Sequence, residues 1–281
     1  MESKGHKIVL GLGAVSGVAS LYYCVFSENN KAFTSWTTGY NVNVSGLVKW
    51  DENWDHRSPK YTKNTRHILN EKDENVVNEE RDTLKPKASR HLILIRHGQY
   101  NLQGLTDNER TLTKLGRLQA ECTAKRLKEL NLPYTIIIKS TMARAQETAS
   151  IISQSLSQVP VKSCDLLREG APIPPEPPLG KYRPQAYKFY QDGSRIEAAF
   201  RKYFHRADGS QLADTYTLLV CHANVIRYFV CRALQFPPEA WLRLSLNHAS
   251  ITWITITPGG RCVLRLLGDS GYMPPDLITT T

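Results

Sequence analysis

Cysteine is scarce in this chain, with six residues among 281. The six are scattered, without a C-x-x-C pair or a dense framework, which argues against a disulfide-stapled secreted domain and against a zinc site. We expect reduced thiols in a core: Cys24, Cys122, Cys164, Cys221, Cys231 and Cys262. Apolar residues make up 41% and charged residues 22%, which excludes a collagen-like or wholly disordered chain.

Acidic residues are in the minority, since 26 Asp and Glu face 36 Lys and Arg and leave a net charge of +10. Residues 1–90 hold 13 basic and 11 acidic groups, so most of the surplus lies in residues 91–281, which hold 23 and 15. A basic half predicts anionic partners, such as nucleic acid, a lipid surface or phosphate esters. The chain lacks a basic patch interleaved with aromatic residues and any known nucleic-acid-binding module, so we expect no nucleic-acid partner.

Residues 8–26 contain no charged side chain. Nineteen helical residues cover roughly 28 Å, about the hydrocarbon thickness of a bilayer. The run exceeds the ~7–15 apolar residues of a signal peptide, and polar, unpatterned sequence follows it, unlike a buried helix of a soluble domain. We predict an uncleaved membrane anchor at 8–26 behind a short tail, residues 1–7. Gly13 and Gly17 have the spacing that lets two such helices approach, although glycine is also common in membrane helices.

Residues 27–90 lack sustained periodicity, and stretches such as KDENVVNEERD (72–82) predict a flexible tether. The tether contains one distinctive motif, WDENWD at 50–55, with two tryptophans four residues apart beside carboxylates. Tryptophan is enriched at interface hot spots, so this motif predicts docking onto a basic, concave surface. Its spacing leaves open whether that surface belongs to the chain's own downstream domain or to a partner. Its docking residues would be Trp50, Asp51, Asn53, Trp54 and Asp55.

From residue 91 onward, apolar runs alternate with amphipathic segments, which predicts an α/β domain over 91–281 with a largely parallel sheet. We expect strands at 91–95, 134–139, 161–167 and 216–220, and a hairpin at the sheet edge formed by 251–257 and 261–267. Helices are predicted at 113–130, after Ser140, at 196–206 and up to residue 235. The prolines of 172–178 predict an ordered loop or a lid.

Two histidines, two arginines and a carboxylate fall just past predicted strand ends, where ligands bind in open α/β sheets. They are Arg96, His97, Arg144, Glu169 and His222. A neutral imidazole can attack phosphorus, guanidinium groups fit phosphoryl oxygens, and a carboxylic acid can protonate an alkoxide and then activate water. No metal-ligand spacing accompanies them, so we expect neither metal nor cofactor. We assign no function to His67, His91, His205 and His248.

Five strings together resemble the histidine phosphatase superfamily, which has the phosphoglycerate-mutase fold. They are LIRHGQYNL (94–102), LTKLGRLQA (112–120), STMARAQET (140–148), LLREGAP (166–172) and CHANVIRY (221–228). WDENWD, RIEAAFRKYFHRA (195–207) and GDSGYMPPD (268–276) further resemble the mitochondrial serine/threonine protein phosphatases of that family. The resemblance implies a three-layer αβα sandwich, preceded by the membrane anchor and the tether.

The resemblance also implies a role for each site residue. His97 matches the phospho-accepting histidine, Arg96 and Arg144 match phosphate clamps, His222 matches the second histidine, and Glu169 matches the general acid and base. WDENWD would dock on a neighbouring subunit, drive homo-oligomer assembly and raise activity. Phosphoserine and phosphothreonine proteins would be the substrates, among them an apoptosis signal-regulating-type kinase, with the anchor in a mitochondrial membrane, the outer one favoured over the inner.

Two other functions stay open at this point. One is a small-molecule phosphatase or phosphoglycerate mutase on the same fold, and the other is a non-catalytic scaffold that works by assembly. Stimulation by a bisphosphate would indicate the mutase. The complete set of five site residues argues against the scaffold.

Overall fold

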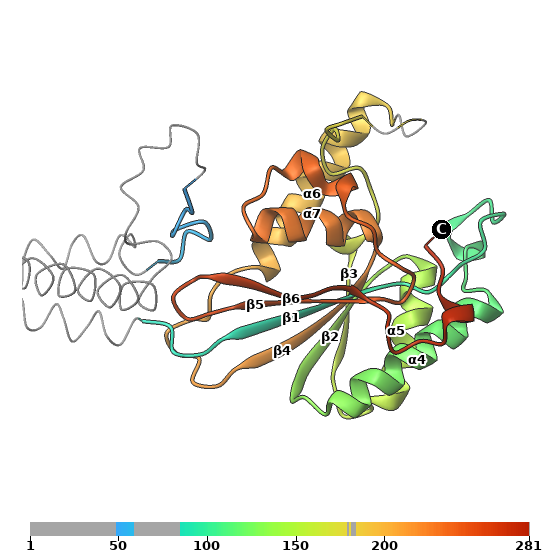
Figure 1. Cartoon of the computed structure of the whole chain (residues 1–281), viewed down its shortest axis with the longest axis horizontal. Helices are drawn as coiled ribbons and strands as arrows, with labels where there is room; N and C mark the ends of the chain where they lie inside the picture. The colour runs from blue at the N-terminus through green and yellow to red at the C-terminus, as the bar shows by residue number, and fades with distance from the viewer. Residues whose placement is uncertain (1–48, 59–84, 179, 181–183, 281) are drawn as a thin grey trace, which may run out of the picture. The chain divides into compact units, whose positions relative to one another are not determined.

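The computed structural model describes residues 49–58, 85–178, 180 and 184–280. Within them, six strands form one mixed sheet in the order β3-β2-β4-β1-β5-β6 (Figure 1). Strands β1 to β4 run parallel, while β5 is antiparallel to β1 and β6 to β5. The strands are β1 (Arg90–Arg96), β2 (Tyr134–Ser140), β3 (Val161–Cys164), β4 (Thr215–Cys221), β5 (Ile251–Ile256) and β6 (Cys262–Asp269). The predicted hairpin at the sheet edge is confirmed.

Helices cover both faces of the sheet, which makes three layers (Figure 1). Alternate residues of β1 face opposite layers: Leu92 and Leu94 pack in the cluster that holds α6 and α7, and Ile93 and Ile95 in the cluster that holds α4 and α5. A strand covered on both faces has no solvent side, which explains its unbroken apolar run. The helices are α4 (Lys114–Leu130), α5 (Ala143–Ser155), α6 (Ala186–Tyr203) and α7 (Ala223–Ala233).

Helix α4 begins and ends at side chains suited to those positions. The Thr113 hydroxyl accepts a hydrogen bond from the Gly116 N–H at 3.0 Å, which satisfies one of the free donors of the first turn. Asn131 follows the last turn with φ of 46°, a left-handed conformation that asparagine tolerates. The helix predicted for 113–130 is confirmed, with Thr113 as its cap.

Two predicted elements have different bounds. The strand expected at 161–167 ends at Cys164, and a 3₁₀ turn, Asp165–Leu167, completes the segment. The helix expected at 196–206 begins ten residues earlier and ends at Tyr203. Its Asp192-Gly193-Ser194 string is typical of a turn, but a side chain at Gly193 would collide with the carbonyl of Pro172. Glycine at this position therefore lets the helix pack closely against the proline loop.

The proline loop is ordered, as predicted, because the 3₁₀ helix η3 (Pro238–Arg243) holds it. The Trp241 indole N–H donates to the carbonyl of Ile173 at 2.9 Å, and Arg243 Nε donates to that of Glu176 at 2.9 Å. The N–H of Glu176 donates to the carbonyl of Glu239 at 3.0 Å.

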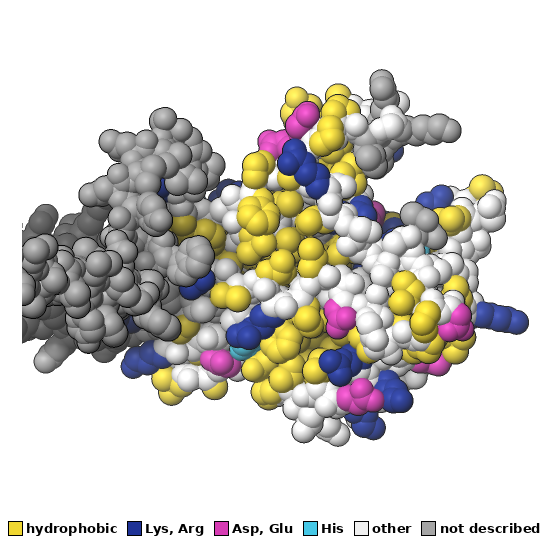
Figure 2. Space-filling view, viewed as in Figure 1, with side chains coloured by type: hydrophobic (Ala, Val, Ile, Leu, Met, Phe, Trp, Pro, Cys, Tyr) yellow, Lys and Arg dark blue, Asp and Glu magenta, His cyan; other side chains and the backbone are white. Residues whose placement is uncertain are grey.

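The predicted anchor at 8–26, Cys24 and His67 lie outside the described residues. No helix in the described ranges is long and apolar enough to cross a membrane. The five cysteines in those ranges are free thiols. Figure 2 shows hydrophobic side chains gathered over the face that carries α6 and α7. Tyr187 and Tyr190 of α6 and Phe236, which follows α7, are exposed.

Candidate active site

The carboxyl ends of β1 and β4 bring two histidines together. Arg96 pairs with Cys221 in the parallel register, and the next residues along the two strands are His97 and His222. The N–H of His97 donates to the carbonyl of Cys221 at 3.0 Å, and the imidazole centroids lie 5.1 Å apart. Both side chains are buried. The predicted convergence of these histidines is therefore a consequence of strand register.

The surroundings of His97 fix its tautomer. Its Nδ1 lies 2.8 Å from the carbonyl oxygen of Gly98, which can only accept, so Nδ1 carries the hydrogen. Nε2 therefore has a lone pair, and it accepts a hydrogen bond from Nε of Arg144 at 3.2 Å. Burial, together with the neighbouring His222, Arg144 and Arg96, holds the pKa of His97 well below 6.5. The imidazole is neutral and nucleophilic at physiological pH.

Arg144 extends from the first turn of α5 with 5% of its side chain exposed. Its guanidinium carbon lies 4.6 Å from the ring centroid of Tyr100, whose ring also meets that of His97 edge-on at 5.1 Å. Tyr100 thus contacts both groups. Burial lowers the pKa of Arg144, while the nearby carboxylates of Glu169 and Asp107 act to raise it.

Arg96 is held by the C-terminal segment. Its Nη1 donates to the carbonyls of Leu246 and Thr280, both at 2.6 Å, and its Nη2 lies 3.1 Å from Nε2 of His248. Burial lowers the pKa of Arg96 to about 10, so it stays cationic at neutral pH. Burial and the Arg96 charge lower the pKa of His248 to about 3, so this histidine is neutral and accepts from Arg96.

The His222 ring is oriented by Ser140, at the end of β2. The hydroxyl oxygen of Ser140 accepts the Met142 N–H at 3.3 Å and lies 2.8 Å from Nε2 of His222. In the tautomer in which this hydroxyl donates to Nε2, the hydrogen of the neutral ring lies on Nδ1. Burial and nearby arginines, Arg144 first, hold the pKa of His222 well below 6.5, so the ring is neutral.

Three buried nitrogens in this site have no hydrogen-bond partner among the described residues. They are Nε of Arg96, Nη1 of Arg144 and Nδ1 of His222, from three different elements. Buried donors without partners are rare and costly in folded proteins. A tetrahedral anion with several oxygens fits this donor set.

Glu169 supplies the carboxyl group. One carboxyl oxygen accepts the N–H of Gly170 at 3.1 Å, and the other accepts the N–H of Asn224, in the first turn of α7, at 3.4 Å. Arg195 on α6 donates to the backbone carbonyl of Glu169 at 3.1 Å. Burial raises the pKa of Glu169 above 4.5, against the opposing effects of the Gly170 N–H and Arg144. A raised pKa suits a carboxyl group that must first give up a proton.

All five predicted site residues therefore lie in one cluster, in which Arg96, His97, Arg144 and His222 are buried and Glu169 is half-buried. Four further residues lie there to which sequence reasoning assigned no role: Tyr100, Asp107, Arg168 and His248. Arg168 stands next to Glu169 in sequence, and its Nη1 donates to the Thr141 hydroxyl at 3.1 Å. Asp107 and His248 lie in segments without regular periodicity. Within the described ranges, no group of three or more His, Cys, Asp or Glu residues could hold a metal ion.

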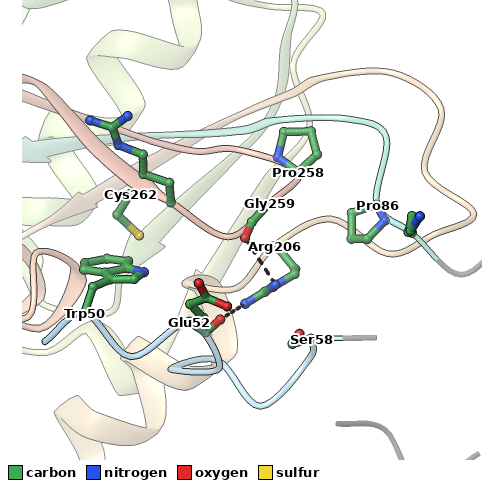
Figure 3. Close-up of a pocket in the computed structure, with 10 residues that line it drawn as sticks. Trp50, Glu52, Ser58, Pro86, Arg206, Pro258, Gly259 and Cys262 are labelled. Atoms are coloured by element: carbon green, nitrogen blue, oxygen red, sulfur yellow. Dashed lines mark hydrogen bonds between the residues drawn. The ribbon is translucent and has the colours of Figure 1, made fainter. Parts of the chain in front are cut away.

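The WDENWD motif lies on its own chain's domain, far in sequence from its contacts (Figure 3). The Trp54 indole N–H donates to the carbonyl of Gly260 at 2.7 Å, and its ring meets that of Phe200 with centroids 6.0 Å apart. The Asp51 N–H donates to Gln235 at 2.7 Å, and the Gln235 amide donates back to the Asp51 carbonyl at 2.9 Å.

A buried ion pair fixes the end of the motif. The carboxylate of Asp55 accepts hydrogen bonds from Nη2 of Arg206 at 2.9 Å and from the Nε and the backbone N–H of the same residue. The side chain of Asp55 is 0% exposed and that of Arg206 is 4% exposed. Burial acts to raise the pKa of Asp55, but Arg206 outweighs it and holds the pKa below 3.8. Arg206 also donates to the carbonyls of Glu52 and Gly259 (Figure 3). We name the surface around Arg206, Gly260, Gln235 and Phe200 the motif-binding surface.

Comparison with known proteins identifies the family. The model of the histidine phosphatase superfamily (branch 1) matches residues 92–171 and 176–270. The chain belongs to the histidine phosphatase superfamily. The mitochondrial serine/threonine-protein phosphatase Pgam5 of Drosophila ananassae is 50% identical over 95% of this chain and 93% of its own. Human PGAM5, which bears the same description, is 56% identical over 82% of this chain and 80% of its own.

These relatives agree with the prediction that this histidine phosphatase is a phosphoprotein phosphatase. The solved structure of YhfR from Bacillus stearothermophilus has a TM-score of 0.51 at 23% identity, covering 65% of this chain and 98% of that one. That likeness shows the shared fold. The predicted α/β architecture with a mostly parallel sheet is confirmed.

Proposed function

We propose that this histidine phosphatase is a mitochondrial, membrane-anchored serine/threonine protein phosphatase that uses a phosphohistidine intermediate on His97. The observation that carries the proposal is the buried, neutral imidazole of His97, whose Nδ1 is fixed on the Gly98 carbonyl and whose Nε2 has the lone pair. Buried guanidinium and imidazole nitrogens without partners surround it.

In the first step, Nε2 of His97 attacks phosphorus and the bond from phosphorus to the serine or threonine oxygen breaks. The carboxyl proton of Glu169 goes to the departing alkoxide. Arg96, Arg144 and Nδ1–H of His222 stabilise the charge on the phosphoryl oxygens. The Gly98 carbonyl continues to accept from Nδ1 of the phosphorylated ring.

In the second step, the Glu169 carboxylate takes a proton from water, and the oxygen of that water attacks the phosphorus. The bond between phosphorus and Nε2 breaks, inorganic phosphate leaves, and His97 regains its lone pair. Glu169 is again protonated. Splitting the transfer into two displacements lets one carboxyl group act as acid and then as base.

The names of the fruit fly and human relatives support a protein substrate over a small phosphate ester. A signalling kinase of the apoptosis signal-regulating type is the substrate we propose. The test uses the full chain and a phosphothreonine peptide, with the folded His97→Ala variant as blank and mass spectrometry of the trapped phosphohistidine. Turnover and a phosphorylated His97 peptide, both absent in His97→Ala, are expected. Hydrolysis of small phosphate esters alone would favour a small-molecule phosphatase. Stimulation by a bisphosphate would favour a mutase, and a folded protein without any activity would favour a scaffold.

We further propose that the WDENWD motif of one copy binds the motif-binding surface of another, and that this assembly raises activity. Residues 59–84 connect the motif to the domain and span up to about 90 Å when extended, enough to reach a neighbour. Helix α6 supports the link to activity, because Phe200 contacts Trp54 and Arg195 holds the backbone of Glu169. The exposed apolar side chains on the α6–α7 face are also consistent with self-association.

Residues 8–26 supply the proposed anchor, and the description "mitochondrial" of the relatives supports the location. The full chain is expected to stay in the membrane pellet when mitochondria are extracted with alkaline carbonate. A variant without residues 8–26 should be released to the supernatant. Accessibility to protease before and after rupture of the outer membrane then distinguishes the outer membrane from the inner one.

A further inference from the structure

Asp107 places a carboxylate among the cations of the active site. It lies in the 3₁₀ helix η1 (Asp107–Glu109), 36 residues before the start of α5. Its Oδ2 accepts the N–H of Ala143, the first residue of α5, at 3.3 Å. Its Oδ1 lies 3.5 Å from Nη1 of Arg144, and its Oδ2 lies 4.0 Å from Nη2 of Arg168. The start of a 13-residue helix and two guanidinium groups thus face one carboxylate.

The fit of this carboxylate is loose. Oδ1 of Asp107 and Nη1 of Arg144 are both buried, and neither has a hydrogen-bond partner among the described residues. Their 3.5 Å separation gives attraction between charges without a hydrogen bond. A charged hydrogen bond is worth more than such a contact, so an anion that bonded to Nη1 would displace Asp107 from Arg144.

Arg144 makes a second interaction, a hydrogen bond to His97, that opposes catalysis. Its Nε–H donates to Nε2 of His97, the lone pair that must attack phosphorus. Asp107 and His97 together hold Arg144 in this orientation. When a phosphoryl group binds, its oxygens must therefore replace the Asp107 carboxylate beside Arg144. Arg144 must also break its hydrogen bond to His97, so that the lone pair of His97 becomes free.

We propose that Asp107 is an internal counter-anion that competes with the phosphoryl group for Arg144 and Arg168. The inference rests on the proposed function, in which Arg144 binds phosphate. It implies that free phosphate binds weakly, because a small anion must displace a tethered carboxylate. A phosphoprotein gains further contacts outside the site and displaces it more readily.

Inorganic phosphate binding, measured by titration calorimetry on the full chain, tests the proposal. Asp107→Asn keeps an acceptor for the Ala143 N–H but removes the charge, and it should tighten phosphate binding by about tenfold, the size of one charged hydrogen bond. The control is Glu109→Gln, which removes one negative charge from the same 3₁₀ helix. Its amide oxygen can still accept the Leu105 N–H that the Glu109 carboxylate accepts at 2.7 Å, and phosphate affinity should stay near wild type.

Two further readouts separate competition from a merely structural role. In the Arg144→Ala background the effect of Asp107→Asn should shrink, because only the more distant guanidinium of Arg168 then remains for Asp107 to compete for. With the phosphopeptide, Asp107→Asn should lower KM. Equal or weaker phosphate binding by Asp107→Asn, with wild-type binding intact, would overturn this proposal alone. Absence of phosphate binding by wild type and all variants would overturn the phosphate site itself, and with it the proposed function.

Discussion

Arg144 donates its Nε–H to Nε2 of His97 across 3.2 Å, so the proposed phosphate clamp and the proposed nucleophile are hydrogen-bonded to each other in the free chain. The charge of this guanidinium disfavours protonation of the His97 ring, while its hydrogen bond occupies the lone pair that has to attack phosphorus. In the proposed mechanism, Arg144 must therefore turn from His97 toward the phosphoryl oxygens when substrate binds.

Arg144→Ala is expected to reduce kcat/KM for a phosphothreonine peptide by roughly 10²–10³, by analogy with the loss of one preorganised donor. Arg144→Lys should recover only a small part, because an ammonium lacks the planar set of donors that spans His97 and a phosphoryl oxygen. Arg201→Ala is the control, since Arg201 is exposed and pairs with Glu197 on the surface of α6. If Arg144→Ala retained near wild-type kcat/KM, the clamp assignment would be wrong.

Glu169→Gln should discriminate between leaving groups. A serine or threonine alkoxide needs the proton that Glu169 supplies, whereas a nitrophenolate leaves readily without it. We expect a much larger loss of phosphorylation rate with phosphothreonine peptide than with nitrophenyl phosphate, measured in a single turnover. An equal loss with both substrates would show that Glu169 is not the acid of the first step.

The pH profile of kcat/KM should reflect the same roles, with His97 as the nucleophile and Glu169 as the acid. Activity requires His97 without a proton on Nε2 and Glu169 with its proton. The acid limb should therefore lie below pH 6.5, where His97 titrates, and the alkaline limb should lie above pH 4.5, where Glu169 titrates. Glu169→Gln should remove the alkaline limb and leave the acid limb in place. Retention of both limbs in that variant would point to a different acid.

The stability of the fold should also depend on pH. Several histidines have pKa values below 6.5 in the folded chain. Below pH 6.5 the unfolded chain therefore binds more protons than the folded chain does. The free energy of unfolding then falls as the pH falls, by up to about 1.4 kcal/mol per pH unit for each histidine. The raised pKa of Glu169 acts in the opposite sense above pH 4.5. These histidines are His91, His97, His205, His222 and His248.

Urea unfolding between pH 7.5 and 5.5 measures this effect. His248→Asn should make the pH dependence shallower, since it removes one of the buried histidines while keeping polar contacts to Arg96 and Thr279. A stability that did not change over this range would mean that the folded histidines carry protons, which would contradict a neutral nucleophile.

The sequence predicted those site residues whose position follows from the neighbouring strand. A buried parallel strand needs an unbroken apolar run, and the residue after such a run lies at the ligand-binding edge, which is how His97 and His222 were found. Asp107 and His248 could not be found this way, because the loops that carry them are positioned by contacts with Ala143 and Thr279, distant in sequence. The first ten residues of α6 were missed for a related reason, because they include Gly193, which is typical of a turn in sequence but packs closely against the distant Pro172.

Mutation of the WDENWD motif should affect size and activity together. Trp54→Ala loses the hydrogen bond to the Gly260 carbonyl and the contact with Phe200, and Arg206→Ala leaves the Asp55 carboxylate without its buried partner. Each variant is expected to form smaller particles by light scattering and to hydrolyse phosphopeptide more slowly. Arg57→Ala, which removes an exposed cation from the same segment, should change neither.

A mixing experiment separates docking within a chain from docking between chains. Trp54→Ala keeps an intact motif-binding surface, and Arg206→Ala keeps an intact motif. If motifs dock between copies, mixing the two impaired variants pairs the intact motif with the intact surface, and part of the particle size and activity should return. If each motif binds only its own domain, as in the single chain described here, the mixture should be no more active than its components, because no molecule then contains both halves of the contact. Partial recovery would therefore require exchange between chains, and its extent at increasing protein concentration would report the affinity of one copy for the next.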